Sequence, residues 1–308
     1  MHLLIVYNPN AGRGKALRHA LKFQKACEQK EITVTKFPAS SLEIMSDFWK
    51  ENAGNPQKFD AAAFIGGDGT LGPNVDAMIK NDILDLPIYA YGRGTANDFA
   101  SYFKTNCSPK KAALAISRGK TIEINTLKVN GNDFAVNVAC GGAFTNGVTK
   151  YNKKSKRWLG KFAYILHAFF MAFTLKSQPI RYTVVTDGDG NSEQFEADTL
   201  LFYILNTKNV GGMKNAGSLA NPSDDLLDLV VLKKCSLFGK ISLKLNQSFN
   251  RMHRCKHVKY IQGKSFRVEH VPEHEITHNF TLTDIDGNAA GPYPLEVSLG
   301  PQIKIITR

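Results

Sequence analysis

The string GGDGT at residues 66–70 combines residue types that suit phosphate chemistry. It follows the apolar run 61–65 and precedes a segment with helical spacing, so we expect it where a strand gives way to a helix. Glycines let a backbone approach a polyphosphate closely, and the N–H groups at a helix start point toward bound anions. Asp68 inside such a loop indicates a cation, so we expect Mg²⁺ held with the phosphates, partly through water. The structural alternative is a tight turn with a helix-capping aspartate.

Two further polar loops follow predicted strands. The string GRGTANDFA at 92–100 follows the short apolar run 88–91, and NPNAGRGK at 8–15 follows the run 3–7. The loop 8–15 lacks the glycine spacing and the Lys-Ser/Thr ending of a Walker A loop, and Asn97 stands where a dinucleotide fingerprint has its third glycine. The loop 92–100 contributes four polar side chains: Arg93, which we expect to meet a phosphate, Thr95, Asn97 and Asp98. Because the carboxyl ends of parallel strands meet at one edge of a sheet, these loops predict a nucleotide site.

The elements that must position these loops alternate between strand and helix. Short apolar runs are separated by segments of helical periodicity throughout residues 1–123, which predicts a parallel sheet covered on both faces. We expect the helix after GGDGT to begin near Pro73, because proline suits the first helical position. We take residues 1–123 as a nucleotide-binding α/β domain, with 293–308 as a candidate for completing it.

Residues 124–292 have a different sequence pattern, in which strand-like segments are separated by turn residues. Helical patterns interrupt them at 156–175 and again at 237–249. Strands gathered after an α/β half predict a second, β-rich domain of the sandwich or barrel type. A last strand over 295–306 is compatible with either domain.

The composition excludes several protein classes and indicates an anionic partner. The 308 residues are 43% hydrophobic and 21% charged, which excludes a disordered chain. The net charge of +12 is concentrated in residues 150–161, with six basic residues, and 229–268, with ten, and neither segment contains an acid. This charge suits nucleic acid, an anionic membrane or a phosphorylated substrate. No recognised nucleic-acid module accompanies it, so we expect no nucleic-acid partner.

Cysteine usage and hydropathy bear on the cellular compartment. The five cysteines are scattered without a CxxC pair, and an apolar strand is predicted from Leu3, so we expect a reduced, cytoplasmic protein without a secretory leader. The apolar stretch 158–175 is interrupted by Lys161 and His167, so we do not expect it to span a bilayer. A lysine-rich lead into aromatic residues over 153–175 suits either an anionic membrane surface or packing on its own domain.

Several motifs together resemble the diacylglycerol kinase catalytic-domain family. They are the Asn8-Pro9 loop, GGDGT, GTANDFA, WLGKFAY at 158–164, GGM at 211–213 and DDLLD at 224–228. Their order covers essentially the whole chain and is most similar to the soluble bacterial lipid kinases, which are related to sphingosine kinases and NAD kinases. GTANDFA is the more specific string and favours a lipid kinase over an NAD kinase.

The resemblance implies an NAD-kinase-like first domain and a β-sandwich second domain that together transfer the γ-phosphate of MgATP to a lipid hydroxyl. Diacylglycerol is the acceptor that it favours. The nucleotide-binding residues that we assign are Asn8, Pro9, Gly66, Gly67, Gly69, Thr70, Gly94, Thr95 and Asn97. Asp68 would handle Mg²⁺ with Asp98 in the same polar network, and Asp224 would hold a second, structural metal.

Some positions depart from the pattern of the resembling family. The family's base for the lipid hydroxyl is the Glu of an Asp-Gly-Glu string, whereas this chain has Asp-Gly-Asn at 286–288, and the neutral Asn288 amide cannot accept a proton. Asp286 or Asp284 could take that role. Other departures are Asn125 for Asp, Asp225 for Gly, Gly72-Pro73 for Asn-Glu and Gly92 for Pro.

Two alternatives therefore stand beside a diacylglycerol kinase. One is a kinase for another acceptor, either a sphingoid base or a nucleotide. The other is a catalytically impaired relative that binds nucleotide or lipid. For the lipid kinase, the expected partners are ATP and a lipid at an anionic membrane surface, with peripheral membrane association and a homodimer as an open possibility.

Overall fold

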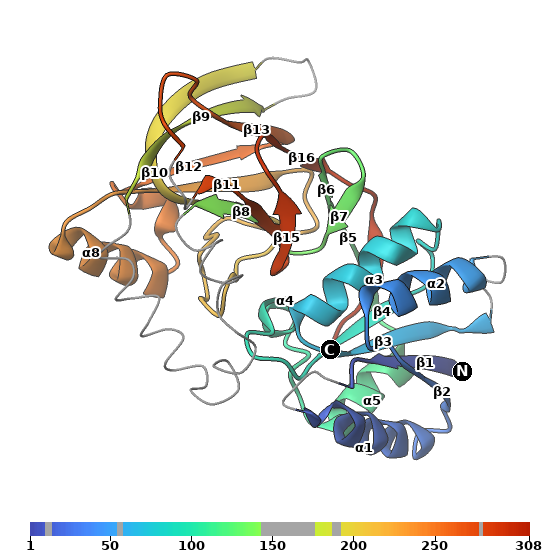
Figure 1. Ribbon diagram of the computed structural model, residues 1–308. Helices are drawn as coiled ribbons and strands as arrows, with labels where there is room; N and C mark the ends of the chain where they lie inside the picture. The colour runs from blue at the N-terminus through green and yellow to red at the C-terminus, as the bar shows by residue number, and fades with distance from the viewer. Residues whose placement is uncertain (10–13, 54–57, 143–175, 187–191, 277–279) are drawn as a thin grey trace. The chain divides into compact units, whose positions relative to one another are not determined.

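A computed structural model describes residues 1–9, 14–53, 58–142, 176–186, 192–276 and 280–308 (Figure 1). The chain forms two compact units. Unit 1 comprises Met1–Thr126, Phe134–Val136 and Gly300–Arg308, and unit 2 comprises Leu127–Asp133 and Asn137–Leu299. The combination of an α/β unit with a β-rich unit confirms the fold class predicted from the sequence.

Unit 1 is built on a six-stranded sheet in the order β2-β1-β3-β4-β17-β5. Its strands are β1 (His2–Tyr7), β2 (Thr33–Pro38), β3 (Ala61–Gly66), β4 (Ile88–Gly92), β5 (Thr121–Ile124) and β17 (Ile303–Ile306). All neighbouring strands are parallel except β5, which runs antiparallel to β17. Strand β3 and the part of β1 after His2 are apolar and buried because helices cover both faces of the sheet.

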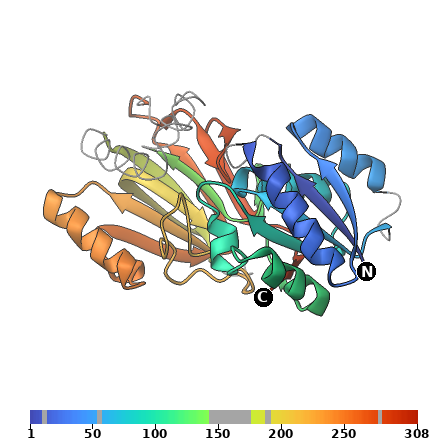
Figure 2. The same ribbon diagram turned by 90° about the horizontal axis from the view of Figure 1, so that it is seen from below.

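The helices of unit 1 form one layer on each face of this sheet (Figures 1 and 2). On one face, α1 (Ala16–Glu28) and α5 (Pro109–Arg118) pack over strand residues such as Leu3 and Ile5. On the other face, α2 (Leu42–Asn52) and α3 (Asp68–Lys80) pack over the alternate residues of the same strands, such as Leu4 and Val6. This alternation follows from the two-residue period of a strand.

Helix α3 begins at Asp68, five residues before the start predicted from Pro73. The backbone turns into the helix within GGDGT, where the carbonyl of Gly67 accepts the N–H groups of Thr70 and Leu71. Pro73 is the sixth residue of the helix, two positions beyond the first four residues, so it has no N–H to donate where a helical bond would otherwise form. The GGDGT string therefore supplies the helix N-terminus itself rather than a loop in front of it.

Unit 2 is built on an antiparallel sheet of eleven strands. They are β6 (Leu127–Val129), β7 (Asp133–Ala135), β8 (Val138–Gly142), β9 (Gln178–Val185), β10 (Ser192–Leu205), β11 (Leu227–Lys233), β12 (Val258–Gly263), β13 (Ser265–His270), β14 (Thr283–Ile285), β15 (Asn288–Gly291) and β16 (Leu295–Leu299). The 14-residue strand β10 organises this sheet, because its first half pairs with β9 and its second half with β8 and β11.

The single strand predicted over 295–306 is two strands in the structure. Strand β16 pairs with β13 and β6 in unit 2, whereas β17 lies between β4 and β5 in unit 1. The break falls at residues 300–302, where Pro301 has no N–H to donate to a ladder. Each half of the predicted strand therefore completes a different sheet.

Two helical predictions in the second half have different outcomes. Helix α8 (Leu237–Ser248) confirms the one over 237–249, and a short 3₁₀ turn, η3 (Met252–Arg254), follows it. The predicted helix over 156–175 lies outside the described residues. No helix within the described part of the chain is both long and apolar enough to cross a bilayer.

Candidate functional site

The three polar loops emerge at one edge of the sheet of unit 1. Strand β3 lies between β1 and β4, with Tyr7 opposite Ile65 and Gly66 opposite Gly92. Residues that follow these strands therefore lie side by side, as the parallel pattern predicted. In the first loop the structure describes Asn8 and Pro9, both half-buried, and it does not describe residues 10–13.

Direct backbone contact joins the second and third loops. The carbonyl of Gly66 accepts a hydrogen bond from the N–H of Gly94 at 3.1 Å. A Cβ atom added to Gly67 would lie 3.1 Å from the Cα atom of Gly94, and one added to Gly94 would lie 2.9 Å from the nitrogen of Gly67. The buried Thr70 side chain occupies the space that a Cβ atom would need at Gly66. These three glycines are thus required by the protein's own packing, whatever ligand is bound.

Asn97 holds the loop between β4 and the short helix α4 (Asp98–Tyr102). Its side-chain oxygen accepts the N–H of Gly94 at 2.6 Å, and its side-chain nitrogen donates to the carbonyl of Gly94 at 3.0 Å. Its backbone is left-handed, with φ at 54°, a conformation that asparagine tolerates better than most residues. The structure therefore gives Asn97 a loop-closing role inside the predicted site.

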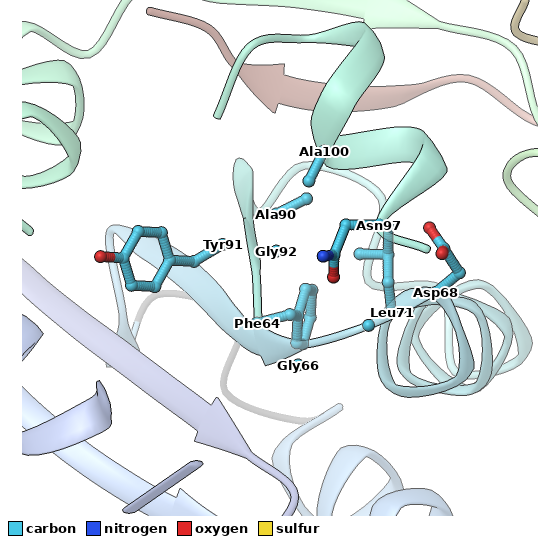
Figure 3. A pocket seen from close by; sticks show the side chains of 10 residues that line it. Phe64, Gly66, Asp68, Leu71, Ala90, Tyr91, Gly92, Asn97 and Ala100 are labelled. Atoms are coloured by element: carbon cyan, nitrogen blue, oxygen red, sulfur yellow. The ribbon is translucent and has the colours of Figure 1, made fainter. Parts of the chain in front are cut away.

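Asp68 is one of the residues that line a pocket at the end of β3 (Figure 3). Its two carboxylate oxygens accept the backbone N–H groups of Asp98 at 3.1 Å and Phe99 at 3.2 Å. It thus caps the neighbouring helix α4 while standing as the first residue of α3. Asp68 is therefore a helix-capping aspartate, but the helix that it caps is α4, which follows the other loop. Each oxygen keeps a second lone pair, so capping leaves the carboxylate able to accept hydrogen bonds from the waters of a hydrated cation.

Gly69 and Thr95 are the predicted nucleotide contacts with open space beside them. No atom lies within 4 Å of a Cβ built on Gly69, so the fold itself does not require glycine there. The Thr95 side chain is exposed in the loop before α4. Helix α3 has no side-chain cap at its N-terminus, so its first N–H groups suit an incoming anion.

Arg93 is engaged by contacts within its own unit. Its guanidinium lies 3.8 Å from the centre of the Tyr91 ring and donates to the carbonyls of Gly92 and Cys107. These contacts hold the side chain against the sheet, because a guanidinium gains both from stacking on an aromatic face and from fixed acceptors.

In unit 2, the Asp286-Gly287 pair forms a tight hairpin turn between β14 and β15. Both residues have positive φ, at 49° and 87°, which is the pattern of a two-residue type I′ turn. One oxygen of the buried Asp286 accepts the N–H groups of Asn137 at 3.1 Å and Val138 at 3.0 Å, at the start of β8. The half-buried Asn288 is the first residue of β15, directly after the turn.

Asp284 has a similar structural function within this hairpin. One of its oxygens accepts the N–H of Gly287 at 2.8 Å, and the residue is buried. Both acids that could replace the missing glutamate therefore hold backbone groups. The strings GGDGT and Asp-Gly-Asn belong to different units of the structure.

The DDLLD segment places two carboxyl groups close enough to influence each other. The half-buried Asp224 accepts the N–H of Leu226 at 3.2 Å, and burial raises its pKa. Asp228 is fully buried, with one oxygen accepting the Tyr260 hydroxyl at 2.6 Å and the other without a hydrogen-bond partner among the described residues. Burial raises the pKa of Asp228 to about 7, with a smaller raising effect from the Asp224 charge and an opposing effect from the Tyr260 hydrogen bond.

Asn125, which departs from the family pattern, also has a structural partner. It is buried and lies after β5. Its side-chain oxygen accepts a hydrogen bond from the amide nitrogen of Gln302 at 3.0 Å. A carboxylate at this position would accept the same bond, but it would carry a buried charge. Both residues lie in unit 1, so the substitution is accommodated locally.

Comparisons with known proteins agree with this arrangement. The profile described as "Diacylglycerol kinase catalytic domain" matches residues 2–129, and the one described as "YegS C-terminal NAD kinase beta sandwich-like domain" matches residues 138–307. The chain belongs to the diacylglycerol kinase catalytic-domain family. This is a family of lipid kinases, and the resemblance noted from the motifs is thereby confirmed.

Individual relatives extend over nearly the whole chain. A protein named diacylglycerol kinase from Bacillus subtilis is 26% identical over 311 residues, covering 98% of this chain and 95% of its own. One of the same name from Staphylococcus aureus is 26% identical over 300 residues, covering 94% and 85%. A crystal structure titled as a diacylglycerol kinase from Bacillus anthracis has a TM-score of 0.74 at 20% identity, covering 100% and 97% of the two chains. The last similarity supports the fold alone.

Unit 2 contains groups whose roles the sequence analysis did not identify. Asp228 was only part of a motif there, and the apolar run 229–232 that follows it could have indicated burial. Tyr260, which satisfies one of its oxygens, is 32 residues away in sequence, and no local signal connects the two. Within the described residues, no group of three or more His, Cys, Asp or Glu side chains is arranged to hold a metal.

Two glycine substitutions should separate packing from ligand binding. Gly94→Ala should lower the free energy of unfolding by about 1–3 kcal/mol, because the new Cβ atom overlaps the Gly67 backbone. Gly69→Ala is the matched control, and it should be neutral or stabilise by up to ~1 kcal/mol, since it adds a methyl group to a helix beside open space. Urea denaturation of both variants measures this. Equal destabilisation would contradict the packing described here.

Asp228 should make stability depend on pH. Its raised pKa means that the unfolded chain ionises near pH 4 while the folded protein holds the proton until about pH 7. Stability should therefore fall as pH rises between these values, at about 1.4 kcal/mol for each pKa unit of difference. Asp228→Asn, which keeps an acceptor for Tyr260, should raise the melting temperature more at pH 8 than at pH 5 in a metal-chelating buffer. An equal gain at both values would contradict the assignment.

Proposed function

We propose that this protein is an ATP-dependent kinase that transfers the γ-phosphate of MgATP to the hydroxyl of diacylglycerol or a closely related lipid. The family places it among lipid kinases. The observation that carries the proposal further is the loop GGDGT, which forms the uncapped N-terminus of α3 with Asp68 held beside it. We assign nucleotide binding to unit 1, which residues 300–308 complete, and lipid binding to unit 2.

The nucleotide phosphates would bind at the edge of the sheet where the three loops meet. Gly69 leaves room for a phosphate to approach the backbone, and the N–H groups of the first turn of α3 would donate to it. Thr95, exposed nearby in the loop before α4, and Asn8, which follows β1, would contact the rest of the nucleotide. Gly66, Gly67, Gly94 and Asn97 would act indirectly, by holding the two loops at this distance.

Asp68 fits the binding of hydrated Mg²⁺. Its oxygens are fixed by the N–H groups of α4, and its remaining lone pairs suit hydrogen bonds from metal-bound water. Mg²⁺ would supply charge neutralisation of the transferring phosphoryl group. Asp98, buried at the start of α4, would add a second carboxyl group to the same region. Phosphoryl transfer depends chiefly on positioning and electrostatics, so a rigidly held carboxylate is the contribution expected of the chain.

The acceptor hydroxyl would lose its proton to the hairpin at 284–288. The second oxygen of Asp286 is our first candidate for that role, with Asp284 as the alternative, because Asn288 cannot accept a proton. A chain without a competent base would bind nucleotide or lipid with little turnover. Asn288 specifically favours this second candidate function, a catalytically impaired relative.

A second, structural metal would lie at Asp224. Burial raises the pKa of both Asp224 and Asp228, and a bound cation would favour the ionised form of each carboxyl group. The described residues bring no third acid, His or Cys to this place, so backbone oxygens and water would complete the ligand set. We further propose that the protein works in the cytoplasm at the anionic membrane surface where its lipid substrate resides, with a homodimer as a compatible state.

A kinase assay with labelled MgATP and detergent-dispersed lipid acceptors tests the proposed function. The protein should phosphorylate diacylglycerol in preference to sphingoid bases or nucleosides, and Asp68→Asn should lower turnover by about 100-fold. Gly69→Ala should raise the KM for ATP by about 10-fold, because its Cβ atom enters the phosphate space. Asp47→Asn, an exposed acid on α2 of the same unit, is the control and should leave turnover unchanged. Absence of transfer to any acceptor would refute the kinase proposal.

The role of Asn288 is tested by restoring an acid. If the base is limiting, Asn288→Glu should raise kcat by 10-fold or more, since general-base catalysis contributes about 10²–10⁴-fold. Asn288→Gln has the same length without the charge and should not raise kcat. If Asn288→Glu leaves kcat unchanged while Asp286→Asn abolishes it, Asp286 is the base in this chain.

A further inference from the structure

Helix α8 packs on unit 2 through its small and polar face. Gly239 lies against Cys235 and His257, where an added Cβ atom would lie 2.7 Å and 2.9 Å from their side chains. Leu243 contacts the apolar cluster of unit 2, and the side-chain amide of the buried Gln247 donates to the carbonyl of Lys214 at 2.9 Å. These three residues recur every four positions and define the inward side of the helix.

The opposite side of α8 is apolar and exposed. Phe238 is 83% exposed, Ile241 51%, Leu245 53% and Phe249, the residue that ends the helix, 69%. At roughly 100° per residue these four side chains fall within an arc of about 80°, away from Gly239, Leu243 and Gln247. Figures 1 and 2 both show α8 on the outer side of unit 2, and none of the described residues covers this face. The helix is thus amphipathic in the reverse of the usual sense for a surface helix.

Basic side chains are concentrated in the segment of the chain that contains this apolar face. Ten lysines and arginines and no acid occur between Leu229 and Val268. Six of them are exposed beside or within the helix segment: Lys233, Lys234, Lys244, Arg251, Arg254 and Lys256. Their charge is not balanced by any acid of the same segment, so the partner of this face must itself be both apolar and anionic.

An anionic bilayer meets both requirements. A second copy of this face would bring its own positive charges against these, because a two-fold contact pairs each patch with itself. A helix of 12 residues is about 18 Å long, well short of the hydrocarbon thickness of about 30 Å, so it would lie in the plane of the membrane surface. Aromatic and aliphatic side chains on one face with flanking lysines and arginines are the composition of such interfacial helices.

We propose that α8 is a membrane-binding helix. Phe238, Ile241, Leu245 and Phe249 insert below the headgroups of an anionic bilayer, and the lysines and arginines of the same segment contact lipid phosphates. The inference deepens the proposed function and rests on it for its biological purpose, since it assigns the surface that would bring a lipid kinase to its substrate. The binding itself requires neither ATP nor a lipid acceptor.

Vesicle sedimentation without ATP or diacylglycerol tests the proposal. The wild-type protein should bind vesicles of phosphatidylcholine containing about one third phosphatidylglycerol, and binding should fall steeply in about 1 M NaCl. Ile241→Ser/Leu245→Ser should lower the partition coefficient by about 10-fold or more, because both side chains lose their contact with acyl chains. Lys233→Glu/Lys234→Glu should lower binding to anionic vesicles to a similar extent.

Leu17→Ser/Leu21→Ser on α1 is the matched control. These leucines have the same four-residue spacing and similar exposure, at 46% and 47%, but lie in unit 1. This variant should change the partition coefficient by less than about twofold. Phe238→Trp gives a direct readout, because its added fluorescence should shift to shorter wavelength when anionic vesicles are present.

Four outcomes would overturn the proposal. Two concern vesicle binding: equal binding by Ile241→Ser/Leu245→Ser and the wild type, or no binding by the wild type. The third is a lower melting temperature of this variant, which would show that the chain itself covers the face. The fourth is a solution mass of this variant half that of the wild type, which would show that a second copy covers it. Phosphorylation of detergent-dispersed diacylglycerol without vesicle binding would refute the surface and leave the kinase intact. Vesicle binding without phosphoryl transfer would support the surface and refute the kinase.

Discussion

The pair of hydrogen bonds from the α4 backbone to the Asp68 carboxylate connects the two loops at the candidate site of unit 1. It joins the end of β3 to the segment after β4 and turns the N-termini of two helices toward one carboxylate. A negative group at a helix N-terminus is stabilised by the local dipole, so this acid is held without a salt bridge. Because the neighbouring glycines then meet backbone to backbone, the site owes its shape to main-chain contacts rather than to long side chains. That rigidity suits a reaction in which positioning provides most of the rate.

The sequence was sufficient for the fold class, the family and the edge of the sheet on which the loops gather. Strand patterns and loop composition are local signals, and they predicted a parallel sheet with polar loops at the ends of β1, β3 and β4, as observed. Other features of the structure depend on contacts that no local sequence pattern predicts. Arg93 has the chemistry of a phosphate ligand, but Tyr91 and two carbonyl groups engage it. Pro73 is a common helix starter, yet the helix begins five residues earlier because the turn is made by Gly67.

The hairpin at 284–288 shows why a catalytic motif is hard to separate from a structural one. Asp and Gly are the residues that a two-residue turn with positive φ demands, so their presence in this string is explained by geometry alone. The residue after the turn carries no such demand, and there this chain has an amide in place of an acid. Asp286 also closes the start of β8, so its retention says more about unit 2 than about proton transfer. Asn288 is therefore the position in this string that the turn geometry does not explain.

The break between β16 and β17 has a consequence for the order in which the protein is made. Strand β5 hydrogen-bonds only to β17 within the sheet of unit 1, and β17 also covers the edge of β4. About 200 residues separate β4 from β17 along the chain, so at roughly 5–20 residues per second the ribosome delivers the missing strand about 10–40 s later. Throughout that interval the first sheet has an open edge with unpaired backbone groups. Unit 1 is therefore the first unit to be synthesised in part and the last to complete its sheet. Unit 2 is synthesised in the interval between these two events.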